Sequence, residues 1–294
     1  MLSGMARIAI IGGGNIGEAL LSGLLRAGRQ VKDLVVAERM PERAKYLADT
    51  YSVLVTSVTE AVENATFVVV AVKPADVDTM MADVSRAAAA AASDVEQVFV
   101  TVAAGITIGY FESKLPAGTP VIRAMPNAAA LVAAGVTALA KGRFVTPEQL
   151  EEASALFDAV GGVLTVSEAQ MDAVTAVSGS GPAYFFLMVE ALVDAGVAVG
   201  LSRQVAADLT AQTMAGSAAM LLERMDQDRH TADGEPVGMQ VDTTAAQLRA
   251  TVTSPGGTTA AALRELERGG LRATVDAAVQ AAKTRSEQLR ITSE

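Results

Sequence analysis

The chain of 294 residues contains no cysteine and no tryptophan, and its single histidine is His230. The missing cysteines exclude disulfide bonds, thiolate zinc sites and a cysteine nucleophile. One histidine cannot build a multi-histidine zinc site. His230 lies in an acidic segment that we expect to be solvated, which also excludes a serine–histidine–aspartate triad. We therefore predict no metal site and a chemistry that depends on other groups.

The chain also lacks an excess of positive charge. Its 23 basic and 33 acidic residues give a formal net charge of −10. Nucleic acids and anionic membranes both attract basic surfaces, so the charge argues against either partner.

Long uninterrupted apolar runs are missing as well. The two longest, residues 124–140 and 183–201, are interrupted by polar side chains such as Asn127 and Asp194, and we predict no transmembrane helix from them. The apolar residues 8–11 near the N-terminus are few and lead into glycine, which indicates a buried strand rather than a signal peptide. Without an export signal or cysteine, we expect a cytoplasmic protein.

What the chain does have is a 51% share of hydrophobic residues, enough for a sizeable core. In its first half, short runs rich in valine and isoleucine alternate with helical stretches such as residues 17–27. Runs that are apolar on both faces are typical of parallel strands covered by helices, so we predict an α/β fold with a Rossmann-type doubly wound sheet. The expected strands are residues 8–11, 34–37, 67–72, 98–102, 121–123 and 136–140.

The second half has a different pattern. After residue 170 the apolar spacing is helical as far as residue 288, and only the polar segment 226–242 predicts a surface loop. We therefore predict two domains, an α/β domain over residues 1–168 and an all-helical domain over residues 169–294.

The first expected strand leads into G-x-G-x-x-G, with its glycines at Gly12, Gly14 and Gly17. In this position, between strand and helix, the motif is typical of a dinucleotide-binding loop. Asn15 and Ile16 lie between the second and third glycines, and the N-terminus of the helix that follows would attract a pyrophosphate. The alternative is a glycine-rich turn without a ligand.

Two charged residues at the end of the second strand concern the choice of cofactor. Glu38 follows Gly17 by 21 residues, where an acidic side chain accepts a hydrogen bond from the adenosine ribose. Glu38 favours NADH, whereas its neighbour Arg39 could pair with the 2′-phosphate of NADPH. The alternative for Arg39 is a solvated charge, so both NADH and NADPH remain open as cofactors.

Five further motifs follow in a fixed order, and together they resemble the pyrroline-5-carboxylate reductase family over nearly the whole chain. The last two are more specific than the glycine loop. The motifs are residues 71–74 (AVKP), 103–106 (AAGI), 123–127 (RAMPN), 178–184 (SGSGPAY) and 253–259 (TSPGGTT).

The resemblance implies reduction of 1-pyrroline-5-carboxylate to proline by hydride from NADPH or NADH, the last step of proline biosynthesis. It also implies an NAD(P)-binding Rossmann domain and a helical domain that binds substrate and interlocks with a second subunit, often in larger rings of dimers. The cofactor residues that it implies are Ala71, Val72, Lys73, Val102, Ala103, Ala104 and Thr251. The substrate residues are Glu168, Ser254, Gly256, Gly257, Thr258 and Thr259.

The chain departs from the family pattern in three places. Ala128 and Ala129 stand where the family usually has Thr-Pro, and Thr244 and Ala245 replace a histidine or acidic residue followed by proline. The polar segment 226–242 is also longer than usual. None of these changes affects the glycine loops.

Residues 254–259 lead into an expected helix at 260–267 and offer free backbone N–H groups to the substrate carboxylate. Hydride transfer to a protonated imine needs no strong acid, only two oriented reactants in a dry pocket. We expect the Thr259 hydroxyl to bind the substrate nitrogen, with water as a proton source. The alternative is that these residues only cap the helix.

Residues 178–182 have the same two interpretations, and we favour helix initiation and packing for them.

Two other functions compete with the imine reductase. A Rossmann dehydrogenase of 3-hydroxy acids usually presents a catalytic lysine on its interdomain helix, and residues 183–201 contain none. A nonenzymatic NAD(P)H-sensing module would not need the motif at 253–259. Turnover of pyrroline-5-carboxylate distinguishes all three.

Overall fold

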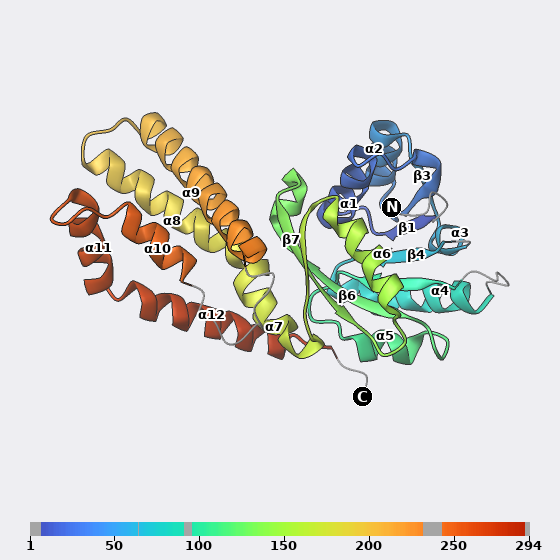
Figure 1. The fold of residues 1–294 in the computed structure, drawn as a ribbon. Helices are drawn as coiled ribbons and strands as arrows, with labels where there is room; N and C mark the ends of the chain where they lie inside the picture. The colour runs from blue at the N-terminus through green and yellow to red at the C-terminus, as the bar shows by residue number, and fades with distance from the viewer. Residues whose placement is uncertain (1–6, 64, 91–95, 232–242, 292–294) are drawn as a thin grey trace. The chain divides into compact units, whose positions relative to one another are not determined.

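The computed structural model describes residues 7–63, 65–90, 96–231 and 243–291. The chain divides into two compact units, one formed by Met1–Pro182 with Val279–Glu294, the other by Ala183–Ala278 (Figure 1). The predicted boundary between residues 168 and 169 separates the domains by function as well as by compactness, and it stays a prediction.

The first unit contains an eight-stranded sheet of order β3-β2-β1-β4-β5-β6-β7-β8. All neighbouring strands are parallel except β6 and β7. This confirms the doubly wound α/β fold. The strands are β1 (Ile8–Ile11), β2 (Leu34–Ala37), β3 (Leu54–Thr56), β4 (Phe67–Val70), β5 (Val98–Thr101), β6 (Val121–Pro126), β7 (Gly135–Lys141) and β8 (Gly161–Thr165).

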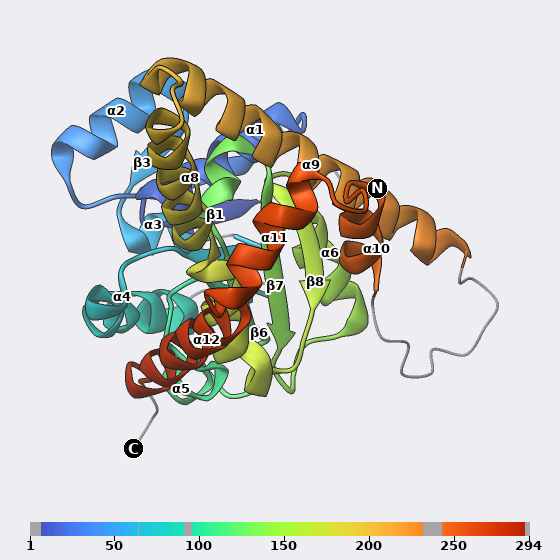
Figure 2. The same cartoon turned by 90° about the vertical axis from the view of Figure 1, so that its left-hand side faces the viewer.

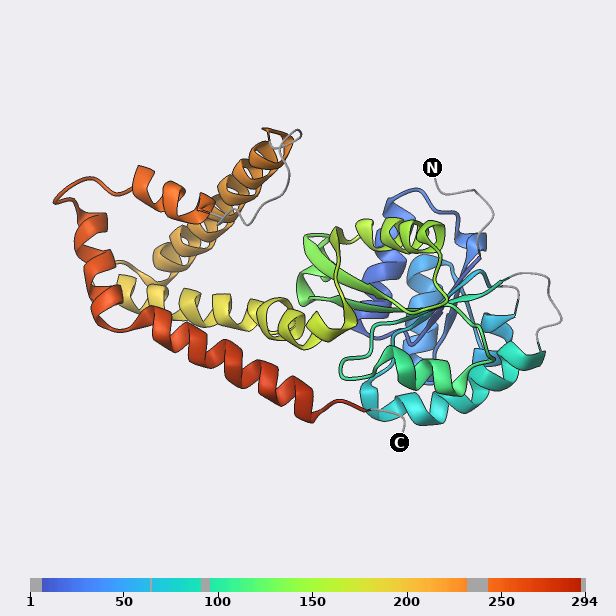
Figure 3. The same ribbon diagram turned by 60° about the horizontal axis from the view of Figure 1, so that its bottom comes forward.

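Helices cover both faces of this sheet (Figure 3). One core contains side chains from α1, α2 and α6, and the other contains side chains from α3, α4 and α5. The central strands are buried along their whole length, as the Val/Ile-rich runs predict. The helices are α1 (Asn15–Arg26), α2 (Pro41–Tyr51), α3 (Val58–Val62), α4 (Val77–Ala90), α5 (Ile108–Lys114), α6 (Pro147–Asp158) and α7 (Met171–Val174).

Two strands and one strand direction differ from the sequence prediction. The strands β3 and β8 lie at the two edges of the sheet, and the sequence analysis predicted neither of them. The three residues of β3 are partly exposed rather than buried, and β8 begins with Gly161 and Gly162, which have a low β propensity. The strand β7 runs antiparallel to β6, which a short apolar run does not reveal.

The second unit is helical in its described part, in agreement with the sequence prediction (Figure 2). Its helices α9 and α10 contact each other, and Thr244 Oγ1 donates to Asp228 Oδ2 at 3.0 Å. The helices are α8 (Gly181–Ala198), α9 (Arg203–Thr231), α10 (Thr244–Thr251), α11 (Thr258–Arg268) and the start of α12 (Leu271–Gln288).

The prediction of a loop over residues 226–242 is wrong for its first part. Helix α9 continues to Thr231, and Arg224 Nε lies 3.3 Å from Asp228 Oδ1 one turn along it. A polar composition does not distinguish a solvated helix from a loop, and spacing of opposite charges by four residues stabilises the helix. Residues 232–242 lie outside the described residues, as does the side chain of His230.

Helix α8 carries a large exposed apolar surface. Phe185, Phe186 and Leu187 expose 62–67% of their area. By length and composition alone, the continuous helical stretch Glu168–Ala198 could cross a membrane. Length and composition are weak indications, because helices buried in a protein interface meet the same requirement.

Candidate functional site

The glycine loop after β1 brings its backbone close to neighbouring backbone groups at positions where a side chain would not fit. Gly12 has a φ of +103°, and a Cβ there would lie 2.8 Å from the Ala71 carbonyl oxygen. A Cβ at Gly17 would overlap the Gly12 carbonyl, so α1 can pack onto β1 only without one. At Gly14, by contrast, a Cβ would meet nothing within 4 Å. The space beside Gly14 therefore lies open at the N-terminus of α1, where helix N–H groups lack intrahelical acceptors.

A cavity of about 620 Å³ extends along the carboxyl ends of β1, β2 and β4. This is the edge of a doubly wound sheet at which nucleotides bind. Seven of the residues predicted for the cofactor line it, namely Gly12, Gly14, Glu38, Arg39, Ala71, Val72 and Lys73.

The other predicted cofactor residues do not line this cavity. Asn15, Ile16 and Gly17 form the first turn of α1, while Val102, Ala103 and Ala104 follow β5. Thr251 belongs to the second unit, where its hydroxyl donates to the Leu248 carbonyl at 2.7 Å.

Glu38 makes two hydrogen bonds to the backbone. Its Oε2 accepts from the Gly13 N–H at 2.9 Å, and its Oε1 accepts from the Met40 N–H, also at 2.9 Å. The carboxylate is thus held against the glycine loop at the position predicted for a ribose contact.

Two cavity residues that the sequence analysis missed complete these contacts. Arg43 Nε donates to the Gly13 carbonyl at 2.7 Å, and its guanidinium pairs with Glu18. Asp76 accepts from Arg39 at 2.8 Å. Asp76 follows the predicted cofactor residue Lys73 by three positions, which was a sequence clue to its place at the site. Its contact with Arg39 was not predictable, because the two residues lie in loops that follow different strands, β4 and β2.

Glu18 gathers several groups at the first turn of α1. Tyr51 Oη donates to Glu18 Oε1 at 2.8 Å, and Tyr46 Oη donates to the same oxygen at 3.0 Å. Burial and the hydrogen bond to Glu18 raise the pKa of Tyr51 to about 12. Burial alone would raise the pKa of Glu18, but the bonds from Tyr51, Arg43 and Tyr46 outweigh it and lower that pKa. Glu18 therefore stays ionised and keeps Arg43 in place.

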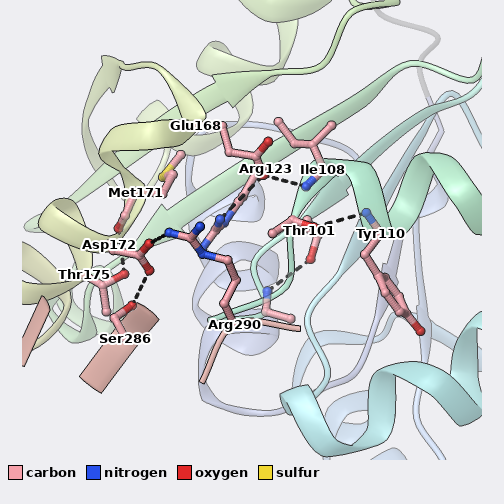
Figure 4. A network of polar contacts seen from close by, with 12 residues as sticks. Thr101, Ile108, Tyr110, Arg123, Glu168, Met171, Asp172, Thr175, Ser286 and Arg290 are labelled. Carbon is pink, nitrogen blue, oxygen red and sulfur yellow. Dashed lines mark hydrogen bonds and ion pairs between the residues drawn. The ribbon is translucent and has the colours of Figure 1, made fainter. Parts of the chain in front are cut away.

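A second polar cluster surrounds Arg123 in the middle of β6 (Figure 4). Glu168 Oε1 accepts from the Ile108 N–H at 2.6 Å and lies 3.6 Å from Nη1 of the buried Arg123. Burial lowers the pKa of Arg123, although Glu168 and Asp172 oppose the shift. The contacts of Glu168 favour a structural role, and its predicted contact with substrate stays a prediction.

Asp172 extends this cluster to the C-terminal helix. Its side chain is 2% exposed, accepts from Ser286 Oγ at 2.6 Å and pairs with Arg290. Burial alone would raise the pKa of Asp172, but the hydrogen bonds from Ser286 and Arg290 lower it overall. The Ile291 N–H also donates to the Gly105 carbonyl at 2.8 Å, directly after the predicted cofactor residues 102–104. The sequence analysis missed all of these contacts.

The residues 178–182 start helix α8 after a π-helical turn, Thr175–Gly179. A Cβ at Gly179 would lie 2.8 Å from the Met125 side chain, and Asn127 Nδ2 donates to Ser178 Oγ at 3.4 Å. These contacts fit the packing role that we favoured for this motif. π-Helical turns often occur at functional sites.

The predicted substrate loop lies in the second unit. The Gly257 N–H donates to the Ser254 carbonyl at 3.0 Å, which closes a turn with Gly256 at a φ of +70°. Gly257 is the N-cap of α11 and makes no side-chain cap, so Thr258 and Thr259 are the first two helical residues. Among the described residues, the Thr259 hydroxyl makes no hydrogen bond. This arrangement leaves the hydroxyl and the first N–H groups of α11 available.

The described residues hold no group of three or more histidine, cysteine, aspartate or glutamate side chains that could bind a metal ion.

Two family models match the chain. The model for pyrroline-5-carboxylate reductase dimerisation matches residues 168–289, and the model for NADP oxidoreductase, coenzyme F420-dependent, matches residues 7–105.

Full-length relatives carry the same family name. Pyrroline-5-carboxylate reductase of Mycobacterium leprae is 82% identical over 294 residues, all of both chains. The reductase of Corynebacterium melassecola is 42% identical over 97% of this chain and 99% of its own.

Two solved structures are similar over almost the whole chain. A pyrroline-5-carboxylate reductase from Coxiella burnetii has a TM-score of 0.86 at 34% identity and covers 98% of this chain and 100% of its own. Plasmodium falciparum pyrroline carboxylate reductase, solved with NADP bound, has a TM-score of 0.77 at 26% identity. It covers 97% of this chain and 98% of its own.

Proposed function

The chain belongs to the pyrroline-5-carboxylate reductase family, and we propose that it reduces 1-pyrroline-5-carboxylate to L-proline, the last step of proline biosynthesis, with NADPH or NADH. The observation that carries the proposal is the 82% identity over the full chain to the Mycobacterium leprae reductase. The glycine loop and its open cavity supply a place for the dinucleotide.

The residues around the cavity fit a dinucleotide. The open space at Gly14 and the N-terminus of α1 would receive the pyrophosphate, with Asn15, Ile16 and Gly17 supplying the first turn. Gly12, Ala71, Val72 and Lys73 would line its path, and Glu38 with Arg39 would face the adenosine ribose. Val102, Ala103, Ala104 and Thr251 would serve the nicotinamide end. When bound, the cofactor supplies the hydride.

The substrate carboxylate would bind the loop of Ser254, Gly256 and Gly257 and the free N–H groups at the start of α11, beside Thr258. The Thr259 hydroxyl would hydrogen-bond the imine nitrogen and orient it for reduction. Glu168 would also contact the substrate, and its carboxylate accepts a hydrogen bond from the Ile108 N–H at the start of α5.

We propose a homodimer, and a ring of such dimers as the larger assembly. The support is the dimerisation-family match over residues 168–289 and the exposed Phe185, Phe186 and Leu187 of α8. A second subunit that covers α8 removes this apolar surface from water. The proposed location is the cytoplasm, with neither nucleic acid nor membrane as partner.

The direct test is a turnover assay with purified protein, pyrroline-5-carboxylate and NADPH or NADH. We expect oxidation of the cofactor and formation of an equal amount of proline, identified by chromatography. Cofactor oxidation without proline, or oxidation of 3-hydroxy acids with NAD⁺ in its place, would contradict the proposal. Binding of NADPH without any turnover would support the sensing module instead.

A further inference from the structure

The ion pair between Arg39 and Asp76 lies on the cavity that would hold the adenosine end of the cofactor. Arg39 follows β2, and Asp76 ends the short turn Pro74–Asp76 that leads from Lys73 into α4. Arg39 Nη2 lies 2.8 Å from Asp76 Oδ1, and both residues line the cavity. The Asp76 carboxylate is therefore already paired with Arg39, the arginine best placed to bind a 2′-phosphate.

Three of the other charged residues of the cavity already have partners, whereas Lys73 follows β4 and is not adjacent to Glu38 in the sequence. Arg43 holds the Gly13 carbonyl and Glu18, and the Glu38 carboxylate is fixed by the Gly13 and Met40 N–H groups. Asp83 pairs with Arg86 along α4. Arg39 is the cation that directly follows the ribose residue Glu38, with its side chain 71% exposed and thus able to turn.

We propose that Asp76 is a specificity-determining residue, which competes with the cofactor's 2′-phosphate for Arg39 and so limits the preference for NADPH over NADH. The inference rests on the proposed use of NAD(P)H. A 2′-phosphate carries up to two negative charges near neutral pH, and to pair with Arg39 it must draw that side chain away from Asp76. NADH has a ribose hydroxyl at this position and leaves the pair intact.

The test measures nucleotide binding rather than turnover. Adenosine 2′,5′-bisphosphate and adenosine 5′-monophosphate differ only in the 2′-phosphate, and isothermal calorimetry gives the Kd of each. We expect Asp76→Asn to tighten binding of the bisphosphate by about two- to fivefold, the range that corresponds to an exposed ion pair. Binding of the monophosphate should not change. In the Arg39→Gln background the same substitution should give no gain.

Asp83→Asn is the matched control, because it removes the same charge from the same cavity but its partner is Arg86. An equal gain in Asp83→Asn would attribute the effect to the overall field and overturn the inference. So would a gain that persists without Arg39, or no gain at all.

The outcomes also separate this inference from the proposed function. A wild-type chain that binds neither nucleotide would refute the nucleotide site itself, and the Asp76 inference with it. A chain that binds both nucleotides but forms no proline would refute the reductase activity, while the effect of Asp76→Asn on nucleotide binding could still be measured.

Discussion

The Gly13 N–H donates to Glu38 Oε2 at 2.9 Å, so the predicted ribose residue also supports the loop that would hold the pyrophosphate. Arg43 holds the carbonyl of the same glycine at 2.7 Å. Both polar groups of the Gly13 backbone are therefore bonded to side chains, one from the residue directly after β2 and one from α2.

This double role changes the expected effect of Glu38→Ala. We expect the ratio of kcat/KM for NADPH over that for NADH to rise, because the carboxylate that disfavours a 2′-phosphate is gone. We also expect both cofactors to bind about fivefold more weakly, because Gly13 loses its acceptor. Glu38→Gln keeps an acceptor for Gly13 and should raise the ratio with less loss of binding. An unchanged ratio in both variants would show that Glu38 does not face the ribose.

Thr259→Val tests the proposed contact with the substrate nitrogen. The substitution keeps the β-branched shape and removes the hydroxyl, so we expect kcat to fall about tenfold to a hundredfold, or about 1–3 kcal/mol. Because Gly257 rather than Thr259 is the N-cap of α11, we expect little change in Tm. Thr258→Val at the adjacent position is the control for stability and cofactor binding. Full kcat with a lowered Tm would refute the catalytic assignment.

Asp172→Asn tests the cluster that joins α7 to the C-terminal helix. Replacing the buried carboxylate weakens its charge-assisted bonds to Ser286 and Arg290, and we expect a loss of about 2–3 kcal/mol in the free energy of unfolding at pH 7. Chemical denaturation measures this loss. Asp194→Asn, at an ion pair whose side chains are both more than 60% exposed, should change stability little.

The same cluster predicts a pH dependence. The pKa of Asp172 is lowered in the folded chain, so its contribution is fully present above the unfolded value of about 4 and is lost as the pH falls through the folded value. The stability difference between wild type and Asp172→Asn should therefore be constant above about pH 4 and shrink below it. A difference that grows on acidification would contradict this account of Asp172.

The exposed apolar face of α8 predicts that the chain associates with copies of itself. We expect light scattering at micromolar concentration to give the mass of a dimer or a multiple of it, and Phe186→Asp to shift the protein toward smaller species. The reason is that a charge in an apolar interface must be desolvated without a partner. A wild-type monomer that is fully active at this concentration would refute the proposed dimer.

Much of the first unit follows from local sequence patterns. Runs that are apolar on both faces occur in an α/β chain as parallel strands, and the strands β1, β2, β4 and β5 begin at the predicted residues. The roles of Gly12 and Gly17 were also predictable, because a glycine there is required by the turn and by helix packing on any such strand. Family motifs extended the prediction to residues 254–259, whose turn and helix the structure contains.

Contacts between distant residues were not predictable from one sequence. The antiparallel direction of β7, the pairing of Arg39 with Asp76, and the bonds of Asp172 to Ser286 join segments whose local patterns are compatible with several partners. Charged side chains in particular have no periodicity that identifies their partners, since an aspartate can pair with any cation that the fold brings near. Residue type and short-range spacing thus determine which elements form, whereas packing over long sequence separations selects the charged groups that meet at the cofactor cavity.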